Sequence, residues 1–376
     1  DYPSPDGGYV DNNSTGHAPR YWEENVRRMF SSSAAMLLDE FHSDGFRVDL
    51  TAAIHRDNRL HANGSLVPAA NLFGIKLLRE LVRTAKIINP KAFLIAEDHS
   101  GWNAMTQSPN DGGIGFDAVW YADFYHHLAG DGDYGDDYAK LVKIAGYGAG
   151  GPLRMDYFAG ALRATQYGKI AYHESHDEAG NGRNTERTIV TAVNGARLSG
   201  ETRRYAEGRC RVAYGMAALS AGTPMFLMGE EIGAAKYFKF DTFYLNKEDL
   251  IGERTGNGRF LFRFYQDLNR LTTTRPSLRS RNIDIVHTHN GNRVIAFLRS
   301  AGAEQTLVAA SLNDRPFPFG YRIAAPDGAY KEVFNSDSVW YGGDNVGNYG
   351  VTLPVANGQI NLILPAHGFI VLQKAS

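Results

Sequence analysis

Three short apolar or aromatic stretches of the sequence end in acidic side chains, the groups that proteins use for nucleophilic attack and proton transfer. They are GFRVD at 45–49, FLIAED at 93–98 and YHESHDE at 172–178. Residues alternate between the two faces of a strand, so Arg47 and Asp49 project to the same side. A guanidinium beside a carboxylate favours the ionised acid, and an ionised Asp at a strand end is suited to nucleophilic attack.

The elements between these stretches indicate how the acids are brought together. Taken alone, the first stretch fits a structural Arg–Asp pair equally well. Helical periodicity over 21–42 and 68–88, however, alternates with the strands expected at 46–50 and 92–96. Such alternation predicts parallel β/α units, in which several barrel strands deliver acids to one face.

The ordered set GFRVD, IAED and SHDE resembles glycoside hydrolase family 13, the α-amylase superfamily. The SHDE form is most similar to the 1,4-α-glucan branching enzymes of that superfamily. So are the later runs FNSD at 334–337 and YGGDNVGN at 341–348. The segment GTPMFLMGEE at 222–231 looks like the eighth barrel strand of the superfamily and its exit.

The resemblance implies roles for five residues. Asp49 would be the nucleophile, Glu97 the acid/base, and Asp177 the residue that stabilises the transition state. Arg47 and His176 match neighbouring contacts to the substrate and the nucleophile. Three acids suffice for a retaining double displacement, which requires a separation of about 5–5.5 Å between the two reacting carboxyls. We expect burial or nearby carboxylates to raise the pKa of Glu97, because a general acid must carry a proton.

Further polar and aromatic residues near the motifs are candidates for substrate binding. Trp102 could stack on a sugar or pack at the barrel rim, and Asp123 is expected to shape the donor side of the cleft. Asp98 points away from Glu97 in an extended chain, so a supporting role is expected for it. For His55, packing or surface exposure is favoured over a place in the cleft.

A metal centre is not expected in this chain. Asp123, His126 and His127 form an Asp-x-x-His-His pattern, which is not a recognised metal site on its own. No glycine-rich phosphate loop stands between a strand and a helix, so no nucleotide and no other cofactor is expected.

The predicted fold class is α/β, with a partial (β/α)8 TIM barrel over 1–280 that contains about strands 4–8. Beyond about 280, short alternating runs separated by turn residues predict an all-β sandwich over 281–376. The superfamily motif of the third barrel strand is missing, so the chain resembles a fragment that begins after that strand. Later expected helices lie near 157–165, 202–221 and 248–272.

Composition limits the possible partners. The formal net charge of −2 gives no general attraction to nucleic acid or to anionic membrane. No run of about eighteen apolar residues occurs, so no membrane span is expected. A single cysteine, Cys210, rules out an internal disulfide and fits a reducing, cytoplasmic setting.

The resemblance therefore implies an enzyme that acts on an α-glucan such as glycogen, starch or a malto-oligosaccharide. Branching, in which a cleaved chain is transferred to a 6-hydroxyl, is favoured by the SHDE form and the C-terminal runs. Hydrolysis of the amylase or malto-oligosyltrehalose trehalohydrolase type stays open, because the catalytic acids would be the same. A non-catalytic glucan-binding fragment is the alternative from another class, since a fold alone does not prove catalysis.

Overall fold

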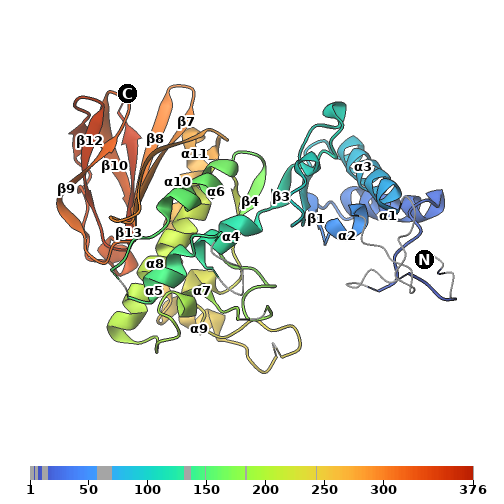
Figure 1. The fold of residues 1–376 in the computed structure, drawn as a ribbon, viewed down its shortest axis with the longest axis horizontal. Coiled ribbons are helices and arrows are strands. Elements are labelled where there is room, and N and C mark those ends of the chain that lie inside the picture. Colours follow the sequence, from blue (N-terminus) through green and yellow to red (C-terminus); the bar gives the residue numbers. More distant parts are fainter. Residues whose placement is uncertain are drawn as a thin grey trace. The chain divides into compact units, whose positions relative to one another are not determined.

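The chain folds as two compact units, unit 1 (Asp1–Tyr121) and unit 2 (Ala122–Ser376). Each unit has its own buried apolar core. No helix in the described part of the chain is long and apolar enough to cross a membrane. The computed structural model (Figure 1) describes residues 4, 7–10, 16–56, 70–130, 137–148, 150–182, 184–242 and 244–375.

Unit 1 alternates helices with short parallel strands, as the sequence predicts. Strand β2 pairs in parallel with both β1 and β3. Helices α1 and α3 contact each other, and Leu38, Leu78 and Leu94 bring α1, α3 and β2 into one core. The expected start of the second helix at Pro68 lies outside the described residues. The elements are α1 (Glu24–Asp39), β1 (Gly45–Val48), α2 (Ala52–His55), α3 (Ala70–Ile88), β2 (Phe93–Ala96), η1 (Asn103–Met105), η2 (Pro109–Asp111) and β3 (Ala118–Trp120).

The register of β1 against β2 places two of the predicted catalytic acids side by side. Gly45 pairs with Phe93 and Val48 pairs with Ala96, so Asp49 and Glu97 each follow directly on a matched pair. The close approach at the start of β1 requires a glycine. A Cβ at Gly45 would lie 1.9 Å from the Phe93 carbonyl oxygen, and the Gly45 φ of 159° is one that other residues rarely adopt.

Unit 2 begins with further β/α elements. Strands β4 and β5 pair in parallel, Ile170 with Thr223 and Ala171 with Pro224. Helix α8 is largely buried, and α10 packs against it. The elements are α4 (Ala122–Leu128), α5 (Leu141–Gly146), α6 (Met155–Ala164), β4 (Lys169–Ala171), α7 (Thr188–Thr191), α8 (Gly200–Leu219), β5 (Thr223–Pro224), η3 (Glu230–Ile232), α9 (Leu250–Thr255), α10 (Arg259–Thr274) and α11 (Pro276–Arg279).

The rest of unit 2 is an all-β sandwich. A six-stranded antiparallel sheet has the order β11-β10-β13-β8-β7-β6, and β12 pairs with β9 in a second sheet. Buried side chains from both sheets, among them Leu307, Ile323 and Ile360, form its core. The strands are β6 (Ile283–His289), β7 (Val294–Ala301), β8 (Glu304–Ser311), β9 (Phe317–Ala324), β10 (Ala329–Asn335), β11 (Thr352–Pro354), β12 (Gln359–Leu364) and β13 (Gly368–Lys374), with η4 (Val339–Tyr341) after β10.

Several expected elements differ in detail. The helix expected over 248–272 is two helices, α9 and α10, because Gly256-Asn257-Gly258 interrupts it. The strand expected over 222–231 pairs over only two residues and is followed by a 3-10 turn. Strands β6 and β9 were not anticipated. In β9, Pro318 and Gly320 hide the alternating pattern.

Buried arginines join the sandwich to the helices of unit 2. The Arg299 side chain on β7 is fully buried and donates to the carbonyls of Asn282 at 2.9 Å and Leu219 at 2.6 Å. It also donates to the carbonyls of Ser220 and Ser280. Burial lowers the pKa of Arg299 to about 10. One side chain thus fastens the end of α8 and the segment after α11 to the sheet.

Replacement of Arg299 by Met should destabilise unit 2. The carbonyls that Arg299 satisfies would stay buried without donors, at a cost of about 1–3 kcal/mol each. We expect the thermal midpoint of unit 2 to fall by about 5 °C or more. Arg270→Met is the matched control, because the Arg270 side chain is 79% exposed. Equal midpoints for the two variants in a melt followed by circular dichroism would contradict the assignment.

Candidate active site

In unit 1, one guanidinium connects two of the predicted catalytic acids. Arg47 Nη1 donates to Asp49 Oδ1 at 2.7 Å, and Arg47 Nη2 forms an ion pair with Glu97 Oε2 at 2.8 Å. The Arg47 guanidinium lies 4.4 Å from the centre of the Trp120 ring, a cation–π contact that fixes its plane. Arg47 lies on β1, Glu97 directly follows β2, and Trp120 ends β3, so the parallel sheet itself assembles this group.

The Glu97 carboxylate is buried and held in its ionised form. Burial raises its pKa, but His99, the Leu50 N–H and Arg47 outweigh burial and lower the pKa to about 2. His99 Nε2 lies 3.7 Å from Glu97 Oε1, and the Leu50 N–H donates to Glu97 Oε2 at 2.7 Å. The expectation of a raised pKa for Glu97 is therefore wrong for this arrangement, because donors and cations surround the buried carboxylate.

Asp49 differs from Glu97 in its exposure. Its side chain is 65% exposed, whereas that of Glu97 is 8% exposed. The chain turns sharply just after Asp49, where Leu50 has a φ of 39°, a conformation that costs energy for a residue with a side chain. The turn carries the Leu50 N–H toward Glu97 and leaves Asp49 accessible.

Behind Glu97, a buried polar network surrounds Asp98. Asp98 Oδ2 lies 2.6 Å from His55 Nε2 and accepts from the Thr51 hydroxyl at 2.9 Å. Its other oxygen accepts from the Ser100 N–H at 2.9 Å. The supporting role expected for Asp98 and the packing role expected for His55 match this arrangement. The ring of half-buried Trp102 lies 4.6 Å from that of His55. Stacking of Trp102 on a sugar stays a prediction.

In unit 2, the third motif forms a compact turn after β4. The Asp177 side chain is 44% exposed, and His176 Nε2 lies 3.5 Å from its Oδ2. The Ser175 hydroxyl accepts from the Asp177 N–H at 3.1 Å. Asn181 fixes the turn by donating to the carbonyls of His176 and Phe238, the latter at 2.7 Å. Asp177 and His176 are thus presented on a braced turn.

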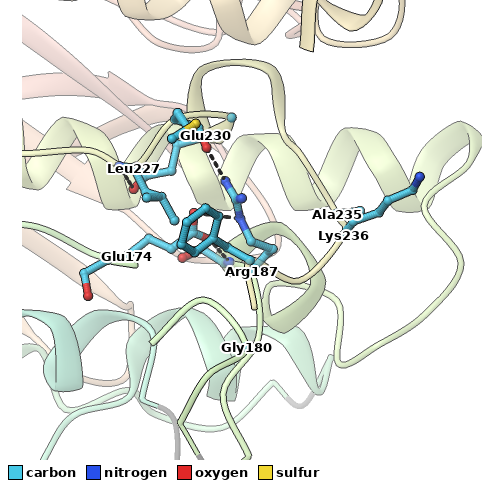
Figure 2. Close-up of polar contacts among 12 residues, drawn as sticks. Glu174, Gly180, Arg187, Leu227, Glu230, Ala235 and Lys236 are labelled. Carbon is cyan, nitrogen blue, oxygen red and sulfur yellow. Dashed lines mark hydrogen bonds and ion pairs between the residues drawn. The ribbon is translucent and has the colours of Figure 1, made fainter. Parts of the chain in front are cut away.

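Residues 173 and 174, which lead into this turn, belong to a buried ionic cluster. Arg187 forms an ion pair with Glu174 at 2.9 Å (Figure 2). His173 pairs with Glu230 at 2.9 Å. Burial lowers the pKa of His173, but the facing Glu230 outweighs it, and the pKa is raised. The Thr188 N–H also donates to Glu174. Glu230 is therefore held in a buried ion pair, which is a structural role.

Asp123 and its neighbouring histidines lie on α4 and do not share one function in the structure. Asp123 is exposed and accepts from the Tyr138 hydroxyl at 3.0 Å. His127 is buried and accepts from the Ala139 N–H at 2.9 Å through Nδ1, and burial lowers its pKa to about 4. Among the described residues, no three His, Cys, Asp or Glu side chains group as metal ligands. Substrate contact by Asp123 stays a prediction.

Sequence reasoning missed Trp120 and Thr51. Trp120 ends the strand after the IAED motif, so parallel register against β2 could have pointed to it. Thr51 gives no local signal, because its partners are 46 and 47 residues away.

The C-terminal part of the chain matches a known family. Residues 285–375 match the α-amylase C-terminal all-β domain. The chain is 28% identical over 350 residues to a 1,4-α-glucan branching enzyme of Marinobacter nauticus, covering 87% of this chain and 50% of that protein. It is 30% identical over 369 residues to a branching enzyme of Xanthomonas oryzae pv. oryzae, covering 91% of this chain and 46% of that protein.

With these matches the chain resembles the α-amylase superfamily, as its acidic motifs predict. It spans about half the length of the curated relatives it matches. The α-amylase of H. orenii superposes with a TM-score of 0.64 at 18% identity, covering 96% of this chain and 67% of that one. A debranching enzyme of Nostoc punctiforme gives 0.63 at 16% identity, covering 99% and 67%. The predicted fold class, part of a TIM barrel followed by an all-β domain, is confirmed.

The Asp98 network predicts how the stability of unit 1 depends on pH. Burial raises the pKa of Asp98, but His55 and Ser100 outweigh it and lower the pKa from 3.8 to about 2. The ionised form thus stabilises the fold above pH 4 by about 2 kcal/mol, and this is lost as pH falls toward 2. The stability gap between wild type and Asp98→Asn should shrink between pH 5 and pH 2 in urea titrations. Asp111→Asn, at an exposed position, is the matched control. A gap for Asp98→Asn that stays constant over this pH range would contradict the prediction.

Proposed function

We propose that this chain carries part of the catalytic machinery of a retaining enzyme that acts on α-glucans. The observation that carries the proposal is the Arg47 guanidinium, which contacts both Asp49 and Glu97 at the carboxyl ends of neighbouring parallel strands. Barrel enzymes act at that end of their strands. Two carboxyls of different exposure beside one cation also suit the two different tasks of a double displacement.

In the proposed mechanism, Asp49 attacks the anomeric carbon while Glu97 gives a proton to the departing glycosidic oxygen. The bond to the leaving group breaks, and a covalent glycosyl ester forms on Asp49. Asp177 stabilises the positive charge that develops on the sugar ring. In the second step an acceptor hydroxyl gives its proton to Glu97 and attacks the anomeric carbon, which releases Asp49. The proposal requires about 5–5.5 Å between the carboxyls of Asp49 and Glu97.

The mechanism requires Glu97 to change its protonation state between the two steps. With Arg47 and His99 against it, Glu97 is ionised, which is the form that the second step uses as a base. The first step needs a protonated Glu97. We therefore propose that sugar binding separates Arg47 from Glu97, because loss of that ion pair raises the pKa of a buried carboxyl.

Branching is the favoured reaction within this class. The curated relatives reported above are named 1,4-α-glucan branching enzymes, and the FNSD and YGGDNVGN runs resemble the same group. In branching, the acceptor is the 6-hydroxyl of another glucan chain. In hydrolysis, it is water, and the same three acids would serve.

Asp49→Asn in the full-length protein should lower kcat on amylose by about a thousandfold or more. The amide cannot form the glycosyl ester, so the covalent step is lost. Asp44→Asn is the matched control, since exposed Asp44 stands at the opposite end of the same strand. Turnover of Asp49→Asn comparable with that of Asp44→Asn would refute the nucleophile assignment.

Proton NMR of amylose treated with the full-length protein should show new α-1,6 linkages without a matching rise in reducing ends. Transfer to a 6-hydroxyl conserves the number of reducing ends, whereas hydrolysis adds one for each bond cleaved. Reducing ends without branches would replace the branching proposal with hydrolysis. No change in the glucan would refute α-glucan activity.

A further inference from the structure

The turn after β1 is tied to the turn after β2 by side chains to which the mechanism assigns no chemical step. Buried Thr51 is the centre of the connection. Its N–H donates to the Glu97 carbonyl at 2.9 Å. Its hydroxyl lies 2.8 Å from that same carbonyl and 2.9 Å from Asp98 Oδ2, so its one proton is shared between two acceptors.

Asp98 and His55 complete the connection. The Asp98 side chain is fully buried and lies 2.6 Å from His55 Nε2. Thr51 precedes the short helix α2, and His55 ends it. Because both side chains bond to Asp98, the two ends of this helix are joined to the residue after Glu97. The Trp102 ring contacts the His55 ring, with centroids 4.6 Å apart and planes tilted by 34°. We name Thr51, His55 and Asp98 the latch.

The latch borders directly on a strained backbone position. Leu50 has a φ of 39°, an energetically unfavourable conformation that contacts of the neighbouring residues must stabilise. The residue after Leu50 is Thr51, and the residue before it is Asp49. The Leu50 N–H in turn donates to the Glu97 carboxylate at 2.7 Å. Any movement of Thr51 therefore shifts Asp49 and Glu97 relative to each other.

Stability alone is a weak explanation for these buried groups. Burial of a carboxylate and an imidazole is expensive, and apolar residues of similar volume often serve stability as well or better. A hydrogen-bonded network, by contrast, fixes one geometry, since its distances and directions are narrowly defined.

We propose that Thr51, His55 and Asp98 are positioning residues that set the spacing and orientation of Asp49 against Glu97. The inference rests on the proposed function, because it gives the latch a task in the double displacement. In the proposed mechanism, the latch does not contact the reacting atoms. It acts through the Leu50 amide and through the backbone of Glu97.

The test compares Thr51→Val with Thr51→Ser in the full-length protein. Valine keeps the shape of threonine and removes the hydroxyl, whereas serine keeps the hydroxyl. A displacement of about 1 Å at reacting groups costs about a hundredfold in rate. We expect Thr51→Val to lower kcat on amylose by about tenfold to a hundredfold with KM changed less than about threefold, and Thr51→Ser to restore kcat.

Thr165→Val is the control for the loss of a buried hydroxyl. Thr165 is also fully buried, and its hydroxyl bonds to two backbone groups, the Leu162 carbonyl and the Ala221 N–H. It should lower the thermal midpoint without lowering kcat of the folded protein. Asp98→Asn is the second variant, in case Thr51→Val folds poorly, and it should show the same fall in kcat.

A second readout is independent of turnover. Carbon NMR of the Glu97 carboxyl should show its titration midpoint rising in Thr51→Val and returning in Thr51→Ser, because the Leu50 N–H is no longer held on it. Arg47 and His99, the charged groups that face Glu97, are unchanged in both variants.

The outcomes separate the two proposals. An unchanged midpoint and an unchanged kcat in Thr51→Val overturn the latch while leaving the proposed function standing. If the wild-type protein leaves amylose unaltered, the proposed function is overturned. The Glu97 titration midpoint in Thr51→Val then shows by itself whether the latch holds the Leu50 N–H on Glu97. A kcat in Thr165→Val as low as in Thr51→Val also overturns the latch.

Discussion

The parallel register of β1 on β2 is the constraint on which the candidate site depends. Because Val48 pairs with Ala96, the residues that follow, Asp49 and Glu97, emerge at the same level of the sheet. A slip of one residue would turn one of the two acids to the other face. The register in turn requires the bare backbone of Gly45, where any side chain would collide with Phe93. A glycine at the beginning of a four-residue strand therefore governs the alignment of groups at its end.

Each acidic motif rests on a buried layer of charge. Behind Glu97 stands the Asp98–His55 pair, and under the Asp177 turn stand the ion pairs of Glu174 and His173. Buried charges are costly unless they are paired, and here the carboxylates of Asp98, Glu174 and Glu230 each lie within 3 Å of a partner side chain. The exposed acids Asp49 and Asp177 can thus stay hydrated and accessible, because the buried pairs next to them fix the backbone.

Sequence alone predicts those features of the site that depend on residues close together in the chain. The strand ends carrying Asp49 and Glu97 and the alternation of helices with strands could be predicted from short-range pattern. The low pKa of Glu97 could not, since Arg47, His99 and the Leu50 amide converge on it only after folding. Strand β9 was hidden by a proline and a glycine that an outer strand tolerates. The latch escaped notice for a related reason, as its bonds join residues more than forty positions apart.

The buried arginines of unit 2 bear on how such proteins can evolve. The family match begins at residue 285, yet Arg299 within it is coordinated by carbonyls at the end of α8, and Arg211 on α8 reaches back to the Tyr341 carbonyl. The domain boundary indicated by sequence similarity is therefore not a boundary in the packing, because residues 122–376 form one compact unit. A genetic exchange that replaced the β-sandwich alone would sever these bonds in both directions. Exchanges that carry α8 together with the sandwich would leave them intact, so the two should be inherited as one block.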